Sequence, residues 1–253
     1  MFKPARKKAV KQLSSRYYLV NFELLEPLSR RPRPLQFINI WIPGVDEVPM
    51  SIALYNGEES LSVIFKVVGE GTKALRDVSG YFGIKGPLGK GLDFVGLKRA
   101  LFVAGGTGIA PLPYTVEYAS LEGVVVDLVW GVRSSDMLFN IRDLAPRLGE
   151  VYYATEDCGT GFCGTATQLA LKLVRENPSK WDMVISVGPN SMLRELCREV
   201  RELVELRISL ESIVKCGLGA CGSCTLKPTP KLLCLDGPVF SCSEVIEYLE
   251  KAP

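Results

Sequence analysis

Four cysteines near the C-terminus have a spacing that is typical of an iron–sulfur site. The segments KCGLGACGSC and LLCLDGPVF contain them in the pattern C-x4-C-x2-C-x9-C, at Cys216, Cys221, Cys224 and Cys234. Plant-type [2Fe–2S] clusters take three thiolates from one short loop and a fourth from farther along the chain. The glycines between the first three cysteines let the backbone adopt positive φ angles and curve closely around inorganic sulfide. The pattern therefore predicts a [2Fe–2S] cluster, which passes one electron at a time.

Zinc binding and disulfide formation are the two alternative uses of these thiols. A zinc ribbon requires two well-separated Cys-x-x-Cys pairs, whereas this chain has one compact trio and a single cysteine. Disulfides are typical of secreted proteins, and the first residues lack the apolar segment of a signal peptide. With eight cysteines in the chain, we therefore expect a cytoplasmic protein in which thiols serve metal binding rather than cross-links. Cys242 is also within reach as the fourth ligand, but Cys234 follows the shorter segment KPTPKLL and precedes an Asp-Gly turn, which favours Cys234.

The overall composition is that of an ordinary globular protein and excludes several functions. The chain has 253 residues, 47% hydrophobic and 23% charged, with a net charge of +2. This length is sufficient for two small domains with real cores, and the charge gives no reason to expect a nucleic-acid partner. Apolar runs are too short to span a membrane, since even VVVDLVWGV is interrupted by Asp127. Histidine is absent, which excludes Rieske-type clusters and Ser-His or Cys-His nucleophilic machinery.

The pattern of apolar residues predicts a multi-domain α+β protein with three folded units. Residues 1–16 contain six Lys or Arg and no acidic residue, and we expect a solvated basic tail. Residues 17–97 have short alternating apolar runs separated by Gly, Pro and Asp, which predicts a small antiparallel β-barrel. Residues 98–206 alternate between buried strands and helices, which predicts a doubly wound parallel α/β sheet. Residues 207–253 form a small C-terminal module that contains the cysteines and a terminal helix.

Two glycine turns in residues 98–206 indicate a nucleotide site. The first, in ALFVAGGTGIAPL, contains Gly105, Gly106 and Gly108 directly after an apolar strand; the second, in VISVGPNSML, contains Gly188 and Pro189. Such turns at the carboxyl ends of parallel strands line one crevice, which is where open α/β sheets bind ligands. Each turn leads into a helix, whose free N–H groups attract phosphate. Because the first turn is not G-x-G-x-x-G, it is not the standard dinucleotide fingerprint.

The order of these motifs resembles the ferredoxin–NADP reductase superfamily. A barrel is followed by GGTGIAPL, WGVRSSDMLF and VGPNSML, and the added KCGLGACGSC and CLDGPVF make residues 17–245 similar to the electron-transfer subunits of type B dihydroorotate dehydrogenases. The resemblance implies FAD in the barrel, NAD in the next domain and the cluster on the four cysteines. The implied FAD segments are VPMS (Val48, Pro49, Met50, Ser51), IFK (Ile64, Phe65, Lys66) and GEGT (with Gly71 and Thr72). The implied NAD residues are Gly105, Gly106, Thr107, Gly108, Gly188 and Pro189.

The chain departs from this superfamily at the start of the first flavin segment. The superfamily usually has an arginine there that pairs with phosphate, and Val48 stands in its place. Because a guanidinium is a strong phosphate ligand, we expect flavin to bind more weakly or to be compensated by Lys66 or Lys73. Arg133 and Ser134, after the WGV strand, lie where a 2′-phosphate could be recognised, so the choice between NAD and NADP stays open.

Three further cysteines have no role in the resemblance. Cys158 and Cys163, in EDCGTGFCG, occupy positions that are usually free of cysteine. Without a third ligand nearby, they are expected to be two incidental thiols, or one of them to lie near the nicotinamide pocket. Cys197 falls on the apolar face of the helix SMLRELCREVREL and is expected to be a core residue.

The resemblance also implies a division of labour between two subunits of de novo pyrimidine biosynthesis. A partner subunit oxidises dihydroorotate to orotate on its FMN, and electrons pass through the cluster and FAD of this chain to NAD+. Flavin must stand between the other two groups, since nicotinamide accepts a hydride and the cluster carries single electrons. The family implies a heterotetramer of two catalytic and two electron-transfer chains. We assign no catalytic residue for dihydroorotate here and expect the chain alone not to oxidise it.

Two other functions fit parts of the pattern. The chain could be the flavoprotein subunit of an NADH-dependent ferredoxin:NADP oxidoreductase or of a hydrogenase diaphorase; those relatives tend to lack the first cysteine of this module, so Cys216 favours the dihydroorotate system. Alternatively, it could be a non-enzymatic, ferredoxin-like redox module whose barrel has lost its flavin. The feature that supports this alternative is Val48, which replaces the phosphate-pairing arginine. A zinc-stabilised binding protein would contain zinc and show no visible absorbance.

Overall fold

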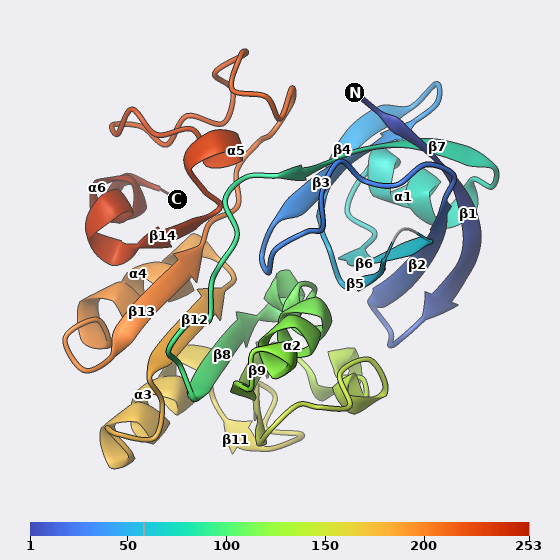
Figure 1. Ribbon diagram of the computed structural model, residues 1–253. Helices are drawn as coiled ribbons and strands as arrows, with labels where there is room; N and C mark the ends of the chain where they lie inside the picture. The colour runs from blue at the N-terminus through green and yellow to red at the C-terminus, as the bar shows by residue number, and fades with distance from the viewer. Residues whose placement is uncertain (58, 253) are drawn as a thin grey trace.

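The computed structural model describes residues 1–57 and 59–252, and in this part of the chain the strands form two sheets of seven strands each (Figure 1). Only Glu58 and Pro253, within the predicted units 17–97 and 207–253, lie outside it. The first sheet is antiparallel, with the strand order β4-β3-β7-β1-β2-β6-β5. Its strands are β1 Lys3–Gln12, β2 Tyr17–Leu24, β3 Phe37–Ile42, β4 Asp46–Ser51, β5 Leu54–Asn56, β6 Ser60–Lys66 and β7 Tyr81–Leu88, with α1 Glu70–Asp77 between β6 and β7.

This first sheet curves around its own hydrophobic core. Alternate residues of β2, such as Val20 and Phe22, are fully buried, while Asn21 between them is half-buried; this is the period of two that a strand requires. Edge strand β4 approaches β6, so the sheet closes toward a barrel. The predicted antiparallel barrel is confirmed.

The prediction of a solvated tail at residues 1–16 was wrong, because β1 lies inside the sheet between β7 and β2. Ala5 is fully buried, and the Lys7 ammonium donates hydrogen bonds to the carbonyls of Leu75 (2.8 Å) and Arg76 (2.7 Å) at the C-terminal end of α1. The basic side chains are compatible with a strand because ion pairs such as Arg6–Glu23 join it to β2. Charge alone therefore did not distinguish a tail from a strand.

The second sheet has the strand order β11-β10-β9-β8-β12-β13-β14 and is parallel except for β14, which pairs antiparallel with β13. Its strands are β8 Arg99–Gly105, β9 Val125–Val132, β10 Val151–Thr155, β11 Phe162–Cys163, β12 Met183–Val187, β13 Glu205–Ser209 and β14 Val239–Ser241. The helices are α2 Leu112–Leu121, α3 Ala166–Glu176, α4 Asn190–Glu199, α5 Leu233–Asp236 and α6 Cys242–Lys251, with short 3-10 turns η1 Gly106–Ile109, η2 Ser135–Met137 and η3 Ile141–Asp143.

Helices cover both faces of the second sheet, as a doubly wound fold requires. The core on one face includes Val116 of α2, and the core on the other includes Leu169 of α3 and Leu196 of α4. The predicted α/β domain is confirmed, with β14 as an antiparallel addition from the C-terminal module. The predicted boundary between residues 206 and 207 falls inside β13.

Two tyrosines lock the barrel to the nucleotide domain. Tyr17 of β2 packs in the core of the nucleotide domain against Trp130, with ring centroids 5.9 Å apart. In the opposite direction, Tyr114 of α2 packs in the barrel core and donates a hydrogen bond to the carbonyl of Pro32 at 2.6 Å. This exchange of large side chains fixes the orientation of the two domains.

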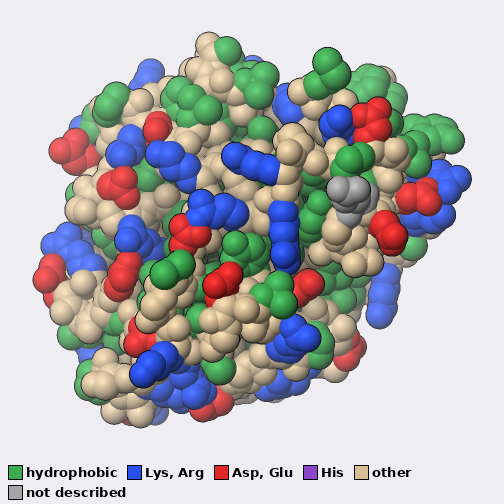
Figure 2. All heavy atoms as spheres, in the orientation of Figure 1, with side chains coloured by type: hydrophobic (Ala, Val, Ile, Leu, Met, Phe, Trp, Pro, Cys, Tyr) green, Lys and Arg blue, Asp and Glu red, His purple; other side chains and the backbone are tan. Residues whose placement is uncertain are grey.

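No helix in the part of the chain that the structure describes is long and apolar enough to cross a membrane. On the face shown in Figure 2, basic and acidic side chains are interspersed.

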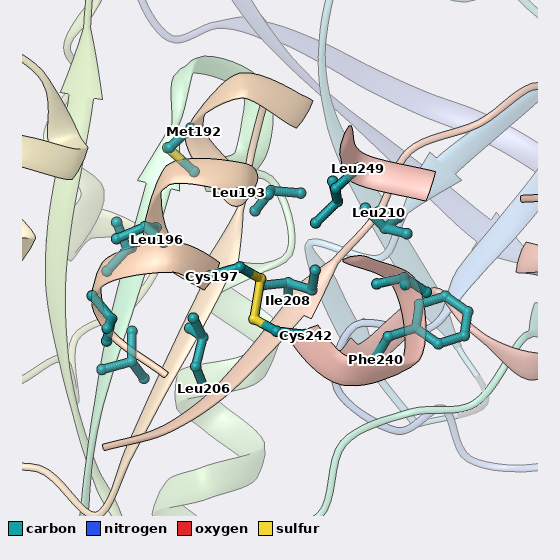
Figure 3. Close-up of a cluster of buried hydrophobic side chains, with 14 of the residues drawn as sticks. Met192, Leu193, Leu196, Cys197, Leu206, Ile208, Leu210, Phe240, Cys242 and Leu249 are labelled. Carbon is teal, nitrogen blue, oxygen red and sulfur yellow. A yellow bond between two sulfur atoms is a disulfide. The ribbon is translucent and has the colours of Figure 1, made fainter. Parts of the chain in front are cut away.

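Four of the eight cysteines form disulfides, so the expectation that the thiols bind metal rather than form cross-links was wrong for these four. Cys197 of α4 pairs with Cys242 of α6, and both residues are buried in a core with Leu193, Ile208 and Leu249 (Figure 3). Cys197 is thus a core residue, as predicted, but a cross-linked one. Because Cys242 is in this disulfide, it is not free to act as the fourth cluster ligand, the alternative to Cys234.

Replacing both Cys197 and Cys242 with Ala should lower the free energy of unfolding by about 2–4 kcal/mol, because the bond closes a long loop in the unfolded chain and spans 45 residues. Denaturant unfolding of wild-type and variant protein, without reductant, measures the difference. Replacing the exposed pair Cys158 and Cys163, five residues apart, is the control and should cost less. An equal cost for the two double variants would contradict the prediction.

Candidate functional site

A crevice of about 1040 Å³ lies between the barrel and the second sheet, at the carboxyl ends of the parallel strands. Both glycine turns line it, and all six residues predicted to bind NAD are brought together there: Gly105, Gly106, Thr107, Gly108, Gly188 and Pro189. Lys66 of the barrel faces them. A crevice of this volume lies at the upper end of the range for ligand pockets. The role of these residues in binding stays a prediction.

The two turns touch each other, which explains their glycines. A Cβ atom on Gly108 would overlap the carbonyl oxygen of Val187, and a Cβ atom on Gly105 would lie 2.7 Å from the sulfur of Met192. Only glycine therefore allows η1 to pack against the turn that follows β12. The same close packing leaves the backbone of the first turn bare toward the crevice, as phosphate binding requires.

The crevice contains charged residues that the sequence did not single out as ligands. Arg16 and Glu211 line it, from opposite ends of the chain. Desolvation lowers the pKa of Lys66, and the nearby Arg16 and Arg133 lower it further. Desolvation in the crevice also raises the pKa of the Glu211 carboxyl, an effect that the Lys66 ammonium opposes. No sequence signal identified Arg16 or Glu211, because both stand in segments without a recognisable motif.

The predicted flavin segments are only partly available to a ligand. The side chains of Val48 and Phe65 are buried in the barrel core, and Ile64 is buried in the core that the barrel shares with the nucleotide domain. Pro49 is exposed, and Met50, Ser51 and Lys66 are half-buried. Of the nine predicted residues, Lys66 lines the crevice. The predicted side chains that can reach a flavin are therefore the exposed and half-buried members of the first two segments: Pro49, Met50, Ser51 and Lys66.

Val48 packs against the start of α1. A Cβ atom on Gly71 would lie 2.5 Å from the Cγ1 atom of Val48. The Thr72 hydroxyl accepts hydrogen bonds from the amides of Val68 (2.9 Å) and Gly69 (3.0 Å), so it caps the helix rather than facing outward. The position where the superfamily carries a phosphate-pairing arginine is thus filled by an apolar contact. The first turn of α1 still leaves backbone N–H groups for an anion.

The four predicted cluster ligands lie near one another in the C-terminal module. Cys224 and Cys234 are buried, with their sulfur atoms 3.4 Å apart, whereas Cys216 is half-buried and Cys221 is exposed. Hydrogen bonding with the Ser223 side chain is the main cause that lowers the pKa of Cys221 to about 6, and burial raises the pKa of Cys234 to about 11.

The backbone of this loop has the form that an iron–sulfur cluster needs. Gly217, Gly219 and Gly222 have φ angles of +67°, +75° and +70°, and a Cβ atom on Gly219 would overlap Leu235. Among residues 1–57 and 59–252, no three His, Cys, Asp or Glu side chains are grouped closely enough to hold a metal ion. The donor set of four thiols on a glycine loop nevertheless fits a cluster, because cysteine thiolates are the ligands that hold [2Fe–2S] centres.

Cys158 and Cys163 are joined by a disulfide and do not remain free thiols. They close the loop after β10, next to Asp157. The Asp157 carboxylate accepts hydrogen bonds from the hydroxyl of Ser134 (2.9 Å) and the amide of Ser135 (2.8 Å). Hydrogen bonds from the backbone of Ser135 and Gly159 hold the pKa of Asp157 well below its usual value. The hydroxyl of Ser134, which lines the crevice, is therefore already engaged.

Replacing Gly108 with Ala should weaken NAD+ binding at least tenfold and destabilise the fold by about 1–3 kcal/mol, since the new methyl group overlaps Val187 and overpacking has costs of this size. Isothermal titration with NAD+ and denaturant unfolding measure the two effects. Gly69→Ala is the control, because a Cβ atom there has nothing within 4 Å. Unchanged affinity in Gly108→Ala would show that this turn does not form the nucleotide site.

Comparison with known proteins gives one family for the whole chain. Residues 211–246 match the iron–sulfur cluster binding domain of dihydroorotate dehydrogenase B. A protein of Archaeoglobus fulgidus named "Probable dihydroorotate dehydrogenase B (NAD(+)), electron transfer subunit" is 36% identical over 223 residues, which cover 86% of this chain and 90% of that protein. A Fusobacterium nucleatum protein named as the same subunit is 36% identical over 226 residues, covering 84% of this chain and 86% of its own length.

Solved structures share the fold at lower sequence identity. The structure of an NADH-dependent reduced ferredoxin-NADP oxidoreductase superposes with a TM-score of 0.83 at 24% identity, covering 98% of this chain and 92% of the other. A ferredoxin reductase of carbazole 1,9a-dioxygenase has a TM-score of 0.68 at 21% identity, with 81% of this chain and 68% of the other covered. Both confirm the predicted arrangement of a barrel followed by an α/β domain.

Proposed function

Since the chain belongs to the family of dihydroorotate dehydrogenase B electron transfer subunits, we propose that it carries electrons from the oxidation of dihydroorotate to NAD+. The observation that carries the proposal is the position of the cysteine module beside the crevice. Glu211 of this module lines the crevice, and the residue before Cys216 contacts the barrel, where Asn39 donates a hydrogen bond to the carbonyl of Lys215 (3.0 Å). A cluster on Cys216, Cys221, Cys224 and Cys234 would therefore lie next to the flavin and nucleotide sites.

In this proposal, three different sets of residues bind the three redox groups. The four cysteines hold a [2Fe–2S] cluster, the surface members of the flavin segments and Lys66 hold FAD, and the two glycine turns hold NAD+. When bound, a flavin exchanges single electrons with an iron–sulfur centre and a hydride with a nicotinamide. Lys66 and Arg16 supply positive charge on the barrel side of the crevice, which compensates in part for Val48. We divide the chain accordingly into a barrel that includes β1, a nucleotide domain that includes all of β13, and a C-terminal cysteine module.

The engagement of Ser134 with Asp157 supports NAD+ as the acceptor. Ser134 has no second proton to donate to a 2′-phosphate, and the ionised Asp157 carboxylate repels a phosphate at short range. Arg133 lines the same end of the crevice, where a guanidinium suits the pyrophosphate as well as a 2′-phosphate.

The exposed rim of the cysteine module supports a protein partner. Ile213, Leu218 and Leu235 are 71%, 61% and 48% exposed; Leu218 lies in the cysteine loop, Leu235 packs against its Gly219, and Cys221 of the same loop is itself exposed. Apolar side chains grouped on a surface commonly mark a protein–protein contact. We place the FMN-containing catalytic subunit there, in a cytoplasmic heterotetramer of two plus two chains. Because we assign no group of this chain to dihydroorotate chemistry, we expect the chain without its partner not to oxidise dihydroorotate.

The test is anaerobic co-expression of the chain with the catalytic subunit, followed by an assay of dihydroorotate-dependent NAD+ reduction. Flavin, iron and sulfide are counted per chain. Yellow, iron-free protein would contradict the cluster, and protein with iron but no flavin would support the ferredoxin-like alternative instead.

Replacing Cys216 with Ser should abolish electron flow to NAD+ while the partner's FMN still reduces an artificial dye. The variant removes a ligand of the cluster, which is the carrier that follows that FMN in the proposed order. Dye reduction and NAD+ reduction are measured on the same complex. Cys158→Ser with Cys163→Ser is the matched control and should retain both activities. Retained NAD+ reduction in Cys216→Ser would overturn the assigned order of carriers.

A further inference from the structure

Three polar side chains of the barrel lie beneath the first cysteine of the C-terminal module. The Nδ2 atom of Asn39 on β3 donates hydrogen bonds to the backbone carbonyl of Lys215 (3.0 Å) and to Oε1 of Glu47 (2.6 Å). Glu47, on β4, also forms an ion pair with Lys85 of β7. The barrel thus contacts the backbone immediately before Cys216 through a connected polar network.

Two members of this network, Asn39 and Lys85, are buried, which is unusual for the outer face of a barrel. The neighbours Ile38 and Ile40 point into the barrel core, so Asn39 points to the opposite face, yet Asn39 is 0% and Lys85 is 8% exposed. Lys215 and Gly217 of the C-terminal module contact Asn39, and the ring of Phe2 lies over the Lys85 ammonium, 4.7 Å from the ring centroid. Burying an amide and an ammonium group costs free energy unless both are well bonded, and the Oδ1 atom of Asn39 has no hydrogen-bond partner within residues 1–57 and 59–252.

The contact between the network and the cysteine loop is specific. A Cβ atom on Gly217 would lie 2.7 Å from Leu88 and 3.6 Å from Nδ2 of Asn39, so Gly217 is pressed against both strands β3 and β7. Cys216 is therefore held between a residue whose carbonyl is bonded by Asn39 and a glycine that packs on Asn39. The position of this thiol depends on the barrel, not only on its own loop.

Charges at this position act on the electron that a cluster receives. Net charge and hydrogen bonding around a cluster set its reduction potential, and charges interact strongly where water is excluded. With a cluster bound, the Lys85 ammonium would stabilise the added negative charge, and the Glu47 carboxylate, 28% exposed, would oppose it.

We propose that Asn39, Glu47 and Lys85 are positioning residues that hold the Cys216 loop and set the reduction potential of the cluster bound there. The inference rests on the proposed function, since it requires a cluster on the four cysteines. It goes beyond that function because it assigns the tuning of the cluster to the flavin-domain barrel. The barrel would thereby match the potential of one carrier to that of the next.

The experiment compares two nearly isosteric variants of the holoprotein whose effects should have opposite signs. Lys85→Met removes the cation and should shift the midpoint potential of the cluster to a more negative value. Glu47→Gln removes the anion and should shift it to a more positive value. We expect each variant to change the equilibrium constant for one-electron reduction about tenfold, which corresponds to about 59 mV. The double variant should return close to the wild-type potential.

Redox titration followed by electron paramagnetic resonance of the reduced cluster gives the potential, and iron and sulfide analysis gives the occupancy. The control is Glu199→Gln, which breaks an exposed ion pair with Arg175 (2.7 Å) between α3 and α4. Its potential should equal that of the wild type. Asn39→Asp, which replaces the donor by an acceptor facing Lys215, should lower both the potential and the cluster occupancy.

Shifts of the same sign in Lys85→Met and Glu47→Gln, or no shift in a fully occupied Glu47→Gln, would overturn the inference and leave the proposed function intact. Wild-type protein without iron and sulfide would instead overturn the proposed function. If Lys85→Met does not fold, Glu47→Gln alone decides, because its uncharged amide can still accept the hydrogen bond from Asn39.

Discussion

The pairing of β14 with β13 is the constraint on which the arrangement of the redox sites depends. This short antiparallel ladder attaches the cysteine module to the edge of the nucleotide sheet, and the disulfide between Cys197 and Cys242 joins the same two regions on the helical side. Cys224 and Cys234 are part of the same continuous core as Leu196 and Ile208. The module is therefore an extension of the nucleotide domain and not a tethered ferredoxin.

The barrel completes this arrangement from the other side. Besides the contact of Asn39 with Lys215, the amide of Lys90 donates a hydrogen bond of 2.5 Å to the carbonyl of Gly237. Tyr17 and Tyr114 fix the barrel against the nucleotide domain. All three units thus meet around one crevice. Electron transfer between bound groups benefits from such rigidity, because the distances between carriers are set by packing and do not require a domain movement.

Burial of charge gives a second theme of the structure. Asp127, which interrupts the apolar run of β9, is fully buried and accepts hydrogen bonds from the guanidinium of Arg99 (2.7 and 3.0 Å) and the indole of Trp181 (2.7 Å). This carboxylate is fully paired, as buried charges must be. The pairs around Glu47 and in the crevice are less complete, and they lie where the proposed cofactors bind. The charge of Asp127 is thus neutralised by its own partners, while the charged groups near the proposed redox sites remain able to interact with a ligand.

Local sequence patterns alone predicted those elements whose formation depends on interactions between residues close together in the chain. Strand alternation predicted the barrel, the change to longer helical periods predicted the α/β domain, and the cysteine spacing with its glycines predicted the ligand loop, because each depends on neighbours within a few residues. The glycine turns were also found in the sequence, since close backbone approach admits no side chain. The tertiary structure decided what depends on distant residues: the strand β1 in a segment that reads as a basic tail, the disulfides of Cys158 with Cys163 and of Cys197 with Cys242, and the meeting of Arg16, Lys66 and Glu211 in one crevice. The side chains that surround these positions come from chain segments up to 195 residues away in sequence. A local sequence pattern cannot predict which distant segment packs against a given residue.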